Sequence, residues 1–351
     1  MHPICFVIIE VSMPSLTQRK NASTAVDSQR ELTALVAGCA IYRPNRQLFS
    51  ITGRDRVRWL NGMVTNNIRD LAPGRGVYSF VLNSQGHILG DLYVFHRGEN
   101  LIAEIENSQA EALLQILKRY IIMDKVEIED LNGKFVVLGI AGPKSADLLA
   151  SAGLGQSLEQ LQFAELPSNG SISNGSMMTV VRDDNPSFGG YEIWAPAEEV
   201  ETVWNSLVSA GVEEVHDQAL EMFRILRGIP KVGQDIRERA LPHETGQERA
   251  LNYTKGCYIG QEIVERIRAR GNVHKTFVGF EVEGPLPAAG TKIQSGGKDV
   301  GELTTIAPVQ LKQKQLALGF IRREALAAGQ VLTAGEATLK PAPLPFSDMF
   351  H

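Results

Sequence analysis

The stretch NYTKGCYIGQE, residues 252–262, places one of the chain's three cysteines between a glycine and a tyrosine, two residues after Lys255. A segment typical of a helix follows from 260 to 270. Free cysteine often packs as a small hydrophobic side chain, so Cys257 can be structural. It can also be reactive, because a helix N-terminus and the charge of Lys255 would both favour the thiolate. The surrounding sequence leaves both interpretations open.

The rest of the chain has the composition of an ordinary globular protein. Its 351 residues exceed what one core usually serves, so two or three domains are expected. Hydrophobic residues make up 43% and charged residues 21%, as in typical globular domains. The net charge of −5 argues against a surface built entirely for nucleic acid, although a local basic surface is compatible with it.

The cysteines are few and far apart. Cys5, Cys39 and Cys257 form no CxxC pair, which argues against a disulfide framework or a metal site and fits a reducing, cytoplasmic location. No apolar run approaches the length of a membrane span. The start lacks the basic segment of a secretory signal, and residues 1–30 are expected to form a loose extension.

Strand and helix patterns alternate through the next two sections. Residues 31–132 are predicted to form a first α+β unit with the strands LFSIT, VYSFVLN, HILGDLYVFH and LIAEIE. Residues 133–275 are predicted to form a second, with the strands KFVVLGIAG, MMTVVR and GGYEIWAP, a helix over 217–227, the KGCYIGQE segment and the bridging helix. The Gly/Ser/Asn-rich SNGSISNGS between two of these strands indicates a loop.

The last section, residues 276–351, changes character. FVGFEVEG, TKIQS, VGELTTIA and LALGFIR are short strand patterns separated by Gly and Pro, which is typical of a small antiparallel barrel. We therefore predict an α+β protein in which two successive mixed α/β units are followed by a small antiparallel β-barrel.

Two acids interrupt apolar strands. Asp91 lies within HILGDLYVF and Glu192 within GGYEIW, and a carboxylate there costs free energy unless it has partners or reaches water. Strand alternation could expose either one, which is the simpler explanation for an isolated case. Because one such acid follows closely behind glycine in each α+β unit, we expect them to share a polar pocket. A carboxylate there can accept two parallel N–H bonds from a pterin or purine ring.

Three further features allow a structural or a functional interpretation. Asn107 can simply mark the entry to a helix. Arg224, between two apolar residues, can extend its head to water or hold an anionic ligand tail. A basic cluster follows Cys257, and it is either a solvated face supported by a Glu262–Arg266 pair or a patch for a phosphate-rich partner. Its members are Arg266, Arg268, Arg270, His274 and Lys275.

From about residue 48 to the end, the chain resembles the YgfZ-type folate-binding proteins, relatives of the glycine-cleavage T-protein (aminomethyltransferase). KGCYIGQE looks like the signature that separates the YgfZ type from the aminomethyltransferases. DRVRWLNGMVTNNI, GHILGDLYVF, GGYEIWAP and FRILRGIPKVGQDI resemble other family segments in the same order. The chain departs from the family at Leu226, where an acid is usual, and at Arg227, where a small residue is usual.

The resemblance implies a three-domain ring around a central opening, with tetrahydrofolate or a one-carbon derivative bound near the middle. It implies that Glu192 holds the pterin, that Asp91 lies at the reactive side of the folate and that Arg224 lies near its carboxylate end. The implied ligand-binding set is Asp91, Asn107, Tyr191, Glu192 and Arg224, and the candidate catalytic set is Cys257, Lys255 and Asp91.

The resemblance also implies a function in maintaining iron–sulfur enzymes, including those that modify tRNA. The expected partners are folate, iron–sulfur enzymes or assembly factors, and tRNA contacted through the basic helix near Arg266 to Lys275. One thiolate cannot supply the several cysteines that a resident cluster needs. The alternative is a folate-dependent aminomethyl- or methyltransferase in which Asp91 orients or activates the folate nitrogen. The sequence leaves open whether the chain catalyses a reaction at all.

Overall fold

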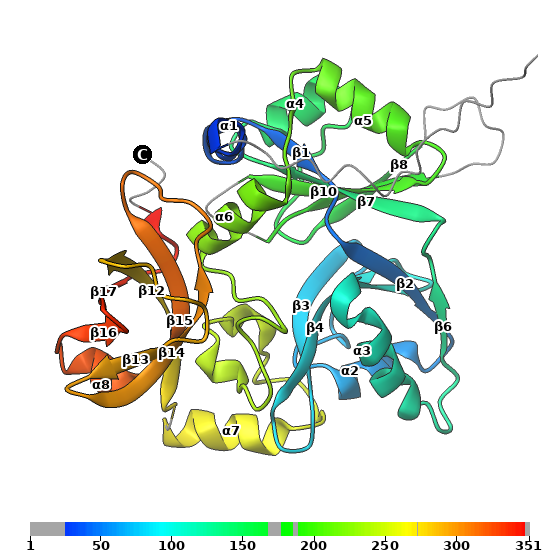
Figure 1. The fold of residues 1–351 in the computed structure, drawn as a ribbon. Coiled ribbons are helices and arrows are strands. Elements are labelled where there is room, and N and C mark those ends of the chain that lie inside the picture. The colour runs from blue at the N-terminus through cyan, green and yellow to red at the C-terminus, as the bar shows by residue number, and fades with distance from the viewer. Residues whose placement is uncertain (1–24, 168–176, 185–188, 272, 348–351) are drawn as a thin grey trace, which may run out of the picture.

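The computed structural model describes residues 25–167, 177–184, 189–271 and 273–347. Figure 1 shows three bodies: a six-stranded sheet at the top, a five-stranded sheet at the lower right and a barrel at the left. The predicted fold class, two mixed α/β units followed by a closed antiparallel barrel, is confirmed. Within the described ranges, no helix combines the length and apolar character needed to cross a membrane.

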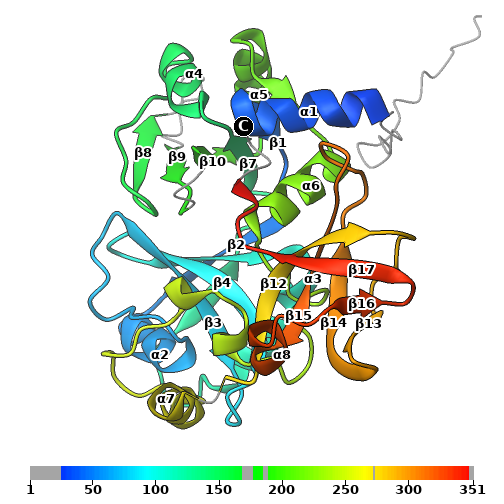
Figure 2. The same ribbon diagram turned by 90° about the vertical axis from the view of Figure 1, so that its left-hand side faces the viewer.

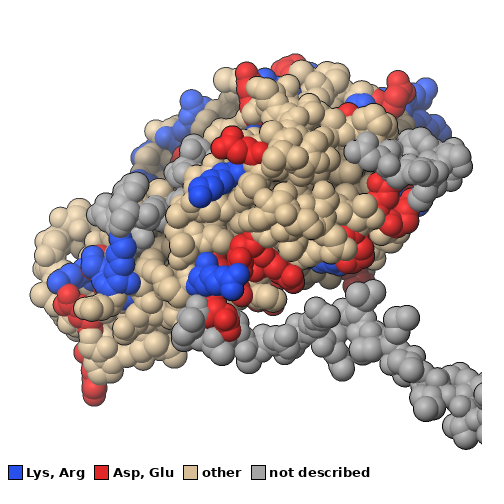
Figure 3. Space-filling view, turned by 90° about the horizontal axis from the view of Figure 1, so that it is seen from above, with Lys and Arg blue, Asp and Glu red and all other residues tan. Residues whose placement is uncertain are grey.

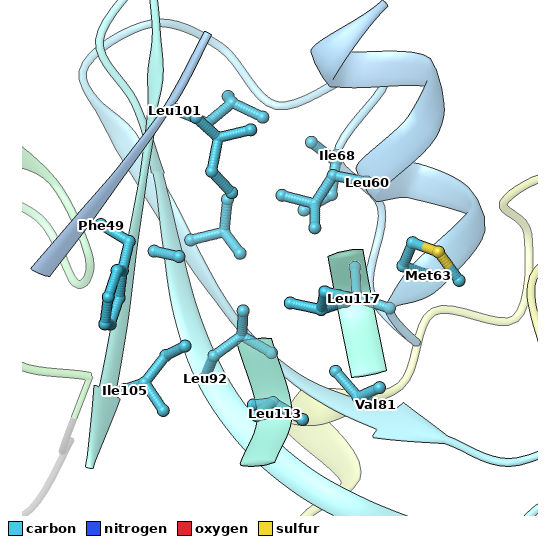
Figure 4. Packing of buried hydrophobic residues seen from close by; sticks show 14 of the residues in the cluster. Phe49, Leu60, Met63, Ile68, Val81, Leu92, Leu101, Ile105, Leu113 and Leu117 are labelled. Atoms are coloured by element: carbon cyan, nitrogen blue, oxygen red, sulfur yellow. The ribbon is translucent and has the colours of Figure 1, made fainter. Parts of the chain in front are cut away.

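The five-stranded sheet belongs to the first unit and has the strand order β3-β4-β5-β2-β6. Its helices pack on one face because their apolar residues recur at helical spacing, as at Leu113 and Leu117. Figure 4 shows these leucines meeting Leu60 and Met63 from the other helix over the strands. The elements are β2 (Arg46–Thr52), α2 (Arg56–Met63), β3 (Arg75–Leu82), β4 (Ile88–His96), β5 (Leu101–Glu106), α3 (Asn107–Arg119) and β6 (Glu127–Asp130).

The six-stranded sheet has the order β11-β1-β7-β10-β9-β8. Figures 1 and 2 both place it above the five-stranded sheet. Its strands are β1 (Ala40–Tyr42), β7 (Phe135–Ala141), β8 (Phe163–Pro167), β9 (Met177–Arg182), β10 (Gly190–Pro196) and β11 (Glu213–Glu214). Its helices are α1 (Ala25–Ala37), α4 (Ser145–Ser151), α5 (Val200–Ser209) and α6 (Asp217–Arg227).

The start of the chain corrects two predicted boundaries. Residues 25–30 are not loose, because α1 begins at Ala25 and packs beside α6, as Figure 2 shows. Strand β1 is not part of the first unit, because its residues pair with β7 and β11 of the second sheet. Burial of Leu32 and Leu35 against Phe223 of α6 holds α1 in place. These contacts join residues far apart in the sequence, which local patterns do not reveal.

The segment that links α6 to the barrel corrects a third boundary. Residues 228–270 were predicted to belong to the second unit, yet their apolar side chains pack on the first sheet. Tyr258 and Val264 lie in one cluster with Phe80 and Leu82 of β3. The segment contains two short 3-10 helices, η1 (Pro242–Glu244) and η2 (Glu248–Ala250), and α7 (Gln261–Arg270). The predicted SNGSISNGS loop lies outside the described residues.

The barrel closes in the order β12-β15-β14-β13-β16-β17, and its strand pairs are antiparallel. Its elements are β12 (Lys275–Glu283), β13 (Lys292–Ser295), β14 (Lys298–Ile306), β15 (Gln315–Arg322), α8 (Arg323–Ala327), β16 (Leu332–Ala334) and β17 (Ala337–Ala342). On the face of the molecule in Figure 3, acidic and basic side chains lie interspersed among uncharged ones. That face therefore presents no single-sign field for a polyanion.

Candidate functional site between the two sheets

The two sheets enclose a cavity of about 130 Å³, which we call the inter-sheet cavity. Beside it, the sheets are joined by a shared aromatic cluster in which Phe95 meets Trp194 edge to face at 5.0 Å. Asp91 of β4 and Glu192 of β10 both line the cavity. The other charged and tyrosine side chains in its lining are Tyr42, Arg46, Tyr78, Tyr93, Glu104, Glu106, Arg182, Asp183, Asp184, Arg227 and Arg249.

Asp91 is held by two donors. The Tyr78 hydroxyl donates to Oδ2 and the Gln109 amide donates to Oδ1, each at 2.5 Å. Burial and the charge of Asp91 raise the pKa of Tyr78, so this hydroxyl retains the proton that it donates. Gly90 makes room for Gln109, because a Cβ at Gly90 would lie 2.7 Å from its amide oxygen. The carboxylate is thus fixed in direction before any ligand arrives.

Glu192 faces a second carboxyl group, that of Glu104 on β5. Burial raises the pKa of Glu192 well above its usual value, and the Glu104 charge raises it further, while Arg46 lowers it. Glu192 therefore keeps its proton to a higher pH than a free carboxyl and shares a hydrogen bond with Glu104. Arg46 donates to Oε1 of Glu104 at 3.1 Å, whereas the buried Oε2 has no partner outside this acid pair within the described parts of the chain. A carboxyl kept protonated can donate to a ligand oxygen or nitrogen.

A glycine places a tyrosine beside Glu192. Tyr42, Gly139 and Glu192 are paired across β1, β7 and β10. A Cβ at Gly139 would approach the Tyr42 ring to 2.3 Å, so only glycine lets the ring lie over the strand at this point. The ring thereby forms a flat wall of the inter-sheet cavity.

Arginines lie over the tyrosine rings of the cavity. The Arg249 guanidinium is 4.2 Å from the centre of the Tyr78 ring and forms an ion pair with Asp184. The Arg46 guanidinium is 5.1 Å from the centre of the Tyr93 ring. The cavity therefore combines flat aromatic walls with carboxyl acceptors and guanidinium donors, a lining that suits a planar, nitrogen-rich ring.

Three of the other predicted site residues lie outside the cavity lining. Tyr191 points to the opposite face of β10 from Glu192, into the core, with Arg182 over its ring at 4.8 Å. Asn107 begins α3, and its backbone N–H donates to the carbonyl of Asn45. Arg224 donates to Glu221, Asp235, Thr305 and the carbonyl of Ile229, so it ties α6 to the barrel.

Lys255 is buried and its ammonium is fully engaged. Nζ donates to the carbonyls of Asn61, Val64 and Asn66 at 2.7, 2.6 and 2.5 Å. Burial and the charge of Arg69 lower its pKa to about 7. Three acceptors use all three N–H groups of an ammonium, so Lys255 fastens the KGCYIGQE segment to the end of α2.

Cys257 lies two residues further on and is exposed. The interpretation of Cys257 as a buried packing residue is therefore wrong. Of the two cysteines in the described residues, Cys39 is the buried one. Cys257 does not line the inter-sheet cavity.

Sequence reasoning missed Glu104, Arg46 and Arg249. Glu104 had a usable signal, because it interrupts the apolar strand LIAEIE just as Asp91 interrupts its own. Arg249 had none, since it reaches the cavity only through the fold of the 228–270 segment. Among the residues that the structure describes, no group of three or more His, Cys, Asp or Glu could hold a metal ion.

Comparison with known proteins assigns the chain to a family. A model of the GCVT N-terminal domain matches residues 20–255. The chain belongs to the GCVT N-terminal domain family. A model of the CAF17 C-terminal β-barrel domain matches residues 274–346, which form the barrel of this GCVT-family chain.

Relatives of this GCVT-family chain include aminomethyltransferases and an iron-sulfur cluster assembly factor. An aminomethyltransferase of Thermus thermophilus is 28% identical over 85% of this chain and 84% of its own. A mitochondrial iron-sulfur cluster assembly factor IBA57 homolog of Pyricularia oryzae is 29% identical over 66% of this chain, which spans only 54% of that protein. The crystal structure of the glycine cleavage system aminomethyltransferase T from Bartonella henselae has the same fold, with a TM-score of 0.80 and 20% identity over 93% of this chain and 91% of its own.

Proposed function

We propose that the chain binds tetrahydrofolate or a one-carbon derivative in the inter-sheet cavity and supports assembly or repair of iron–sulfur enzymes, as a YgfZ-type protein. The observation that carries the ligand assignment is the meeting of Asp91 and Glu192 in one cavity. Support for the iron–sulfur role comes from the CAF17-type barrel and from the relative named as an iron-sulfur cluster assembly factor.

The cavity lining fits the ring of a folate. Asp91 offers a fixed acceptor to ring N–H groups, and Glu192 offers both an acceptor and, while protonated, a donor. At about 130 Å³ the cavity is smaller than the roughly 300–1,000 Å³ of typical ligand pockets. It therefore suits the ring alone, and the rest of a folate would extend out of it.

Calorimetric titration tests the ligand. Tetrahydrofolate should bind the wild type and lose at least about tenfold in affinity with Glu192→Ala, because hydrogen bonds to a buried carboxyl are lost. The matched control is Glu198→Ala, which removes an exposed glutamate just after the end of β10. This variant should bind tetrahydrofolate as the wild type does. Equal binding by Glu192→Ala and the control would end the assignment.

The role of the thiol needs a separate test in cells. In a deletion strain, the wild-type chain should restore the activity of iron–sulfur enzymes, and Cys257→Ala should restore less. Exposure of Cys257 supports contact with a partner. Full rescue by Cys257→Ala would remove the thiol from the proposed function.

The second candidate is a folate-dependent aminomethyl- or methyltransferase. It is favoured by the identity with an aminomethyltransferase over most of both chains and by the fixed carboxylate of Asp91 beside the cavity. Production of methylene-tetrahydrofolate from an aminomethyl-lipoyl carrier or from sarcosine, lost with Asp91→Asn, would decide for it. If neither the aminomethyl-lipoyl carrier nor sarcosine were turned over, the transferase candidate would be rejected and the accessory role would be kept.

Contact with tRNA through the segment from Arg266 to Lys275 is part of the same proposal. Arg266, Arg270 and His274 line a groove of about 570 Å³ beside His87 of the β3–β4 turn. A steep salt dependence of tRNA binding, reduced in Arg266→Ala with Arg270→Ala, is the expected signature. Salt-independent binding would count against this contact.

A further inference from the structure

Arg227, the last residue of α6, stands between two hollows of the molecule. It lines the inter-sheet cavity, and it also lines a groove of about 580 Å³ beside the barrel, which we call the barrel groove. Other residues of the barrel groove come from the 245–247 turn, from β12 and from the 341–345 segment. Arg227 is therefore a side chain that the cavity and the groove have in common.

The guanidinium of Arg227 is withdrawn from water but has unused hydrogen-bonding capacity. The side chain is 13% exposed, and its buried Nε has no hydrogen-bond partner among the residues that the structure describes. Nη2 lies 3.4 Å from Asp183, a long contact, and the group lies 5.3 Å from the centre of the Phe223 ring. A buried donor without a partner costs roughly 1–3 kcal/mol, which a ligand acceptor could recover.

Arg224, one turn earlier on the same helix, has the opposite surroundings. Its Nε and both terminal nitrogens donate to protein acceptors on Glu221, Asp235 and Thr305. It is therefore already committed to joining α6 to the barrel, while Arg227 is not. Of these two arginines, Arg227 is the one that can receive an anion without breaking the fold.

Charge decides the side from which an anion can approach Arg227. On the cavity side the lining includes the carboxyl groups of Asp183 and Glu192. On the groove side, Arg227 is the one charged side chain among the described residues of the lining. Gly228, with φ +67°, ends the helix against Leu344 directly after Arg227. An anion in the barrel groove thus meets a cation and no carboxylate.

We propose that Arg227, at the junction of the inter-sheet cavity and the barrel groove, binds a carboxylate on the tail of a ligand whose ring occupies the cavity. This inference rests on the proposed function and adds a residue that discriminates between ligands with and without an anionic tail. Arg227 stands where the resemblance led us to expect a small residue, so the discrimination is a property of this chain.

A cycle of two ligands and several variants tests the inference by calorimetry. The ligands are tetrahydrofolate, which carries the glutamate tail, and 6-methyltetrahydropterin, which has the ring without it. Arg227→Met should bind tetrahydrofolate about tenfold more weakly than the wild type, since a charge-assisted pair is lost, and should bind the pterin within about twofold of it. Arg227→Lys keeps the charge and should retain part of the preference.

The matched control is Arg119→Met, which removes an exposed arginine from the last turn of another amphipathic helix. It should leave both affinities unchanged, and thermal unfolding of each variant verifies that it is folded. Equal weakening of both ligands by Arg227→Met, or no weakening of either, would overturn the inference while leaving folate binding intact. If the wild type binds neither ligand, the proposed function fails, and this inference with it.

Discussion

Lys255 and Glu192 are both ionisable groups withdrawn from water, but they differ in how fully the protein satisfies their hydrogen bonds. Lys255 gives its three N–H groups to three backbone carbonyls and fastens two segments together. Glu192 faces another acid, Glu104, and one oxygen of Glu104 has no partner outside this pair among the described residues. A buried group whose hydrogen-bonding capacity the protein uses fully ties segments of the fold together, whereas a buried acid pair that is poorly satisfied lowers stability and is available to a ligand. Each prediction below tests that contrast.

The largest expected effect is on stability at Lys255. Lys255→Met leaves three carbonyls without their donor, and at about 1 kcal/mol or more for each it should lower the free energy of unfolding by at least ~3 kcal/mol. Urea titration measures this. Lys118→Met, on the exposed face of α3, should change it by less than about 0.5 kcal/mol. Equal stability of the two variants would show that the three hydrogen bonds of Lys255 contribute nothing to the free energy of unfolding.

The next effect is the pH dependence of stability at Glu192. Its folded-state pKa is raised by burial and by Glu104, against the opposing charge of Arg46. Above the unfolded value near 4.5, the unfolded chain releases this proton while the folded chain keeps it, so stability should fall as the pH rises through that window.

Glu192→Gln cannot ionise, so it should remove this fall and be more stable than the wild type at pH 8. Urea titrations at intervals from pH 5 to pH 8 measure it, and Glu198→Gln serves as the control. If the free energy of unfolding of Glu192→Gln changed with pH as that of the wild type does, the Glu192–Glu104 pair would not be the cause of the fall.

A smaller effect is expected at His243, a buried neutral group. Burial lowers its pKa from 6.5, and neither ring nitrogen has a hydrogen-bond partner in the described ranges of the structure. As the pH falls through about 6.5 the unfolded chain gains a proton that the folded chain resists, so stability should decrease on acidification. His243→Phe should lessen that decrease between pH 7 and pH 5.5, whereas the exposed His274→Phe should not. Matching profiles for the two variants would exclude His243 as the cause.

The smallest expected effect is at Cys257. Because the side chain is exposed, Cys257→Ser should change the free energy of unfolding by less than about 0.5 kcal/mol in urea titration. With Lys255→Met strongly destabilising, this would separate the two halves of one short motif into a structural residue and a surface residue. A loss above about 1 kcal/mol would assign Cys257 to the fold as well.

Local patterns in the sequence predicted much of the architecture. Alternating apolar residues marked β2, β4 and β5, the helix over 217–227 was predicted at its observed bounds, and the barrel followed from short strands broken by glycine. The acids inside apolar strands were also readable, because burying a carboxylate demands a reason. That argument brought Asp91 and Glu192 to one pocket, as the structure places them.

What the sequence did not reveal depends on contacts between distant residues. No local sequence pattern predicts that β1 pairs with β7, or that the 228–270 segment packs on the first sheet. The same limit explains the arginines. Arg224 and Arg227 look alike along the helix, and they are distinguished by distant residues such as Asp235 and Thr305, which bind Arg224, and by the groove beside Arg227.

The measurement that tests the central claim most directly is a crystal structure determined with tetrahydrofolate bound. The account predicts the ring in the inter-sheet cavity, hydrogen-bonded to Asp91 and Glu192, with the glutamate tail reaching Arg227. A ligand bound on another surface, with both acids still facing only protein, would contradict it.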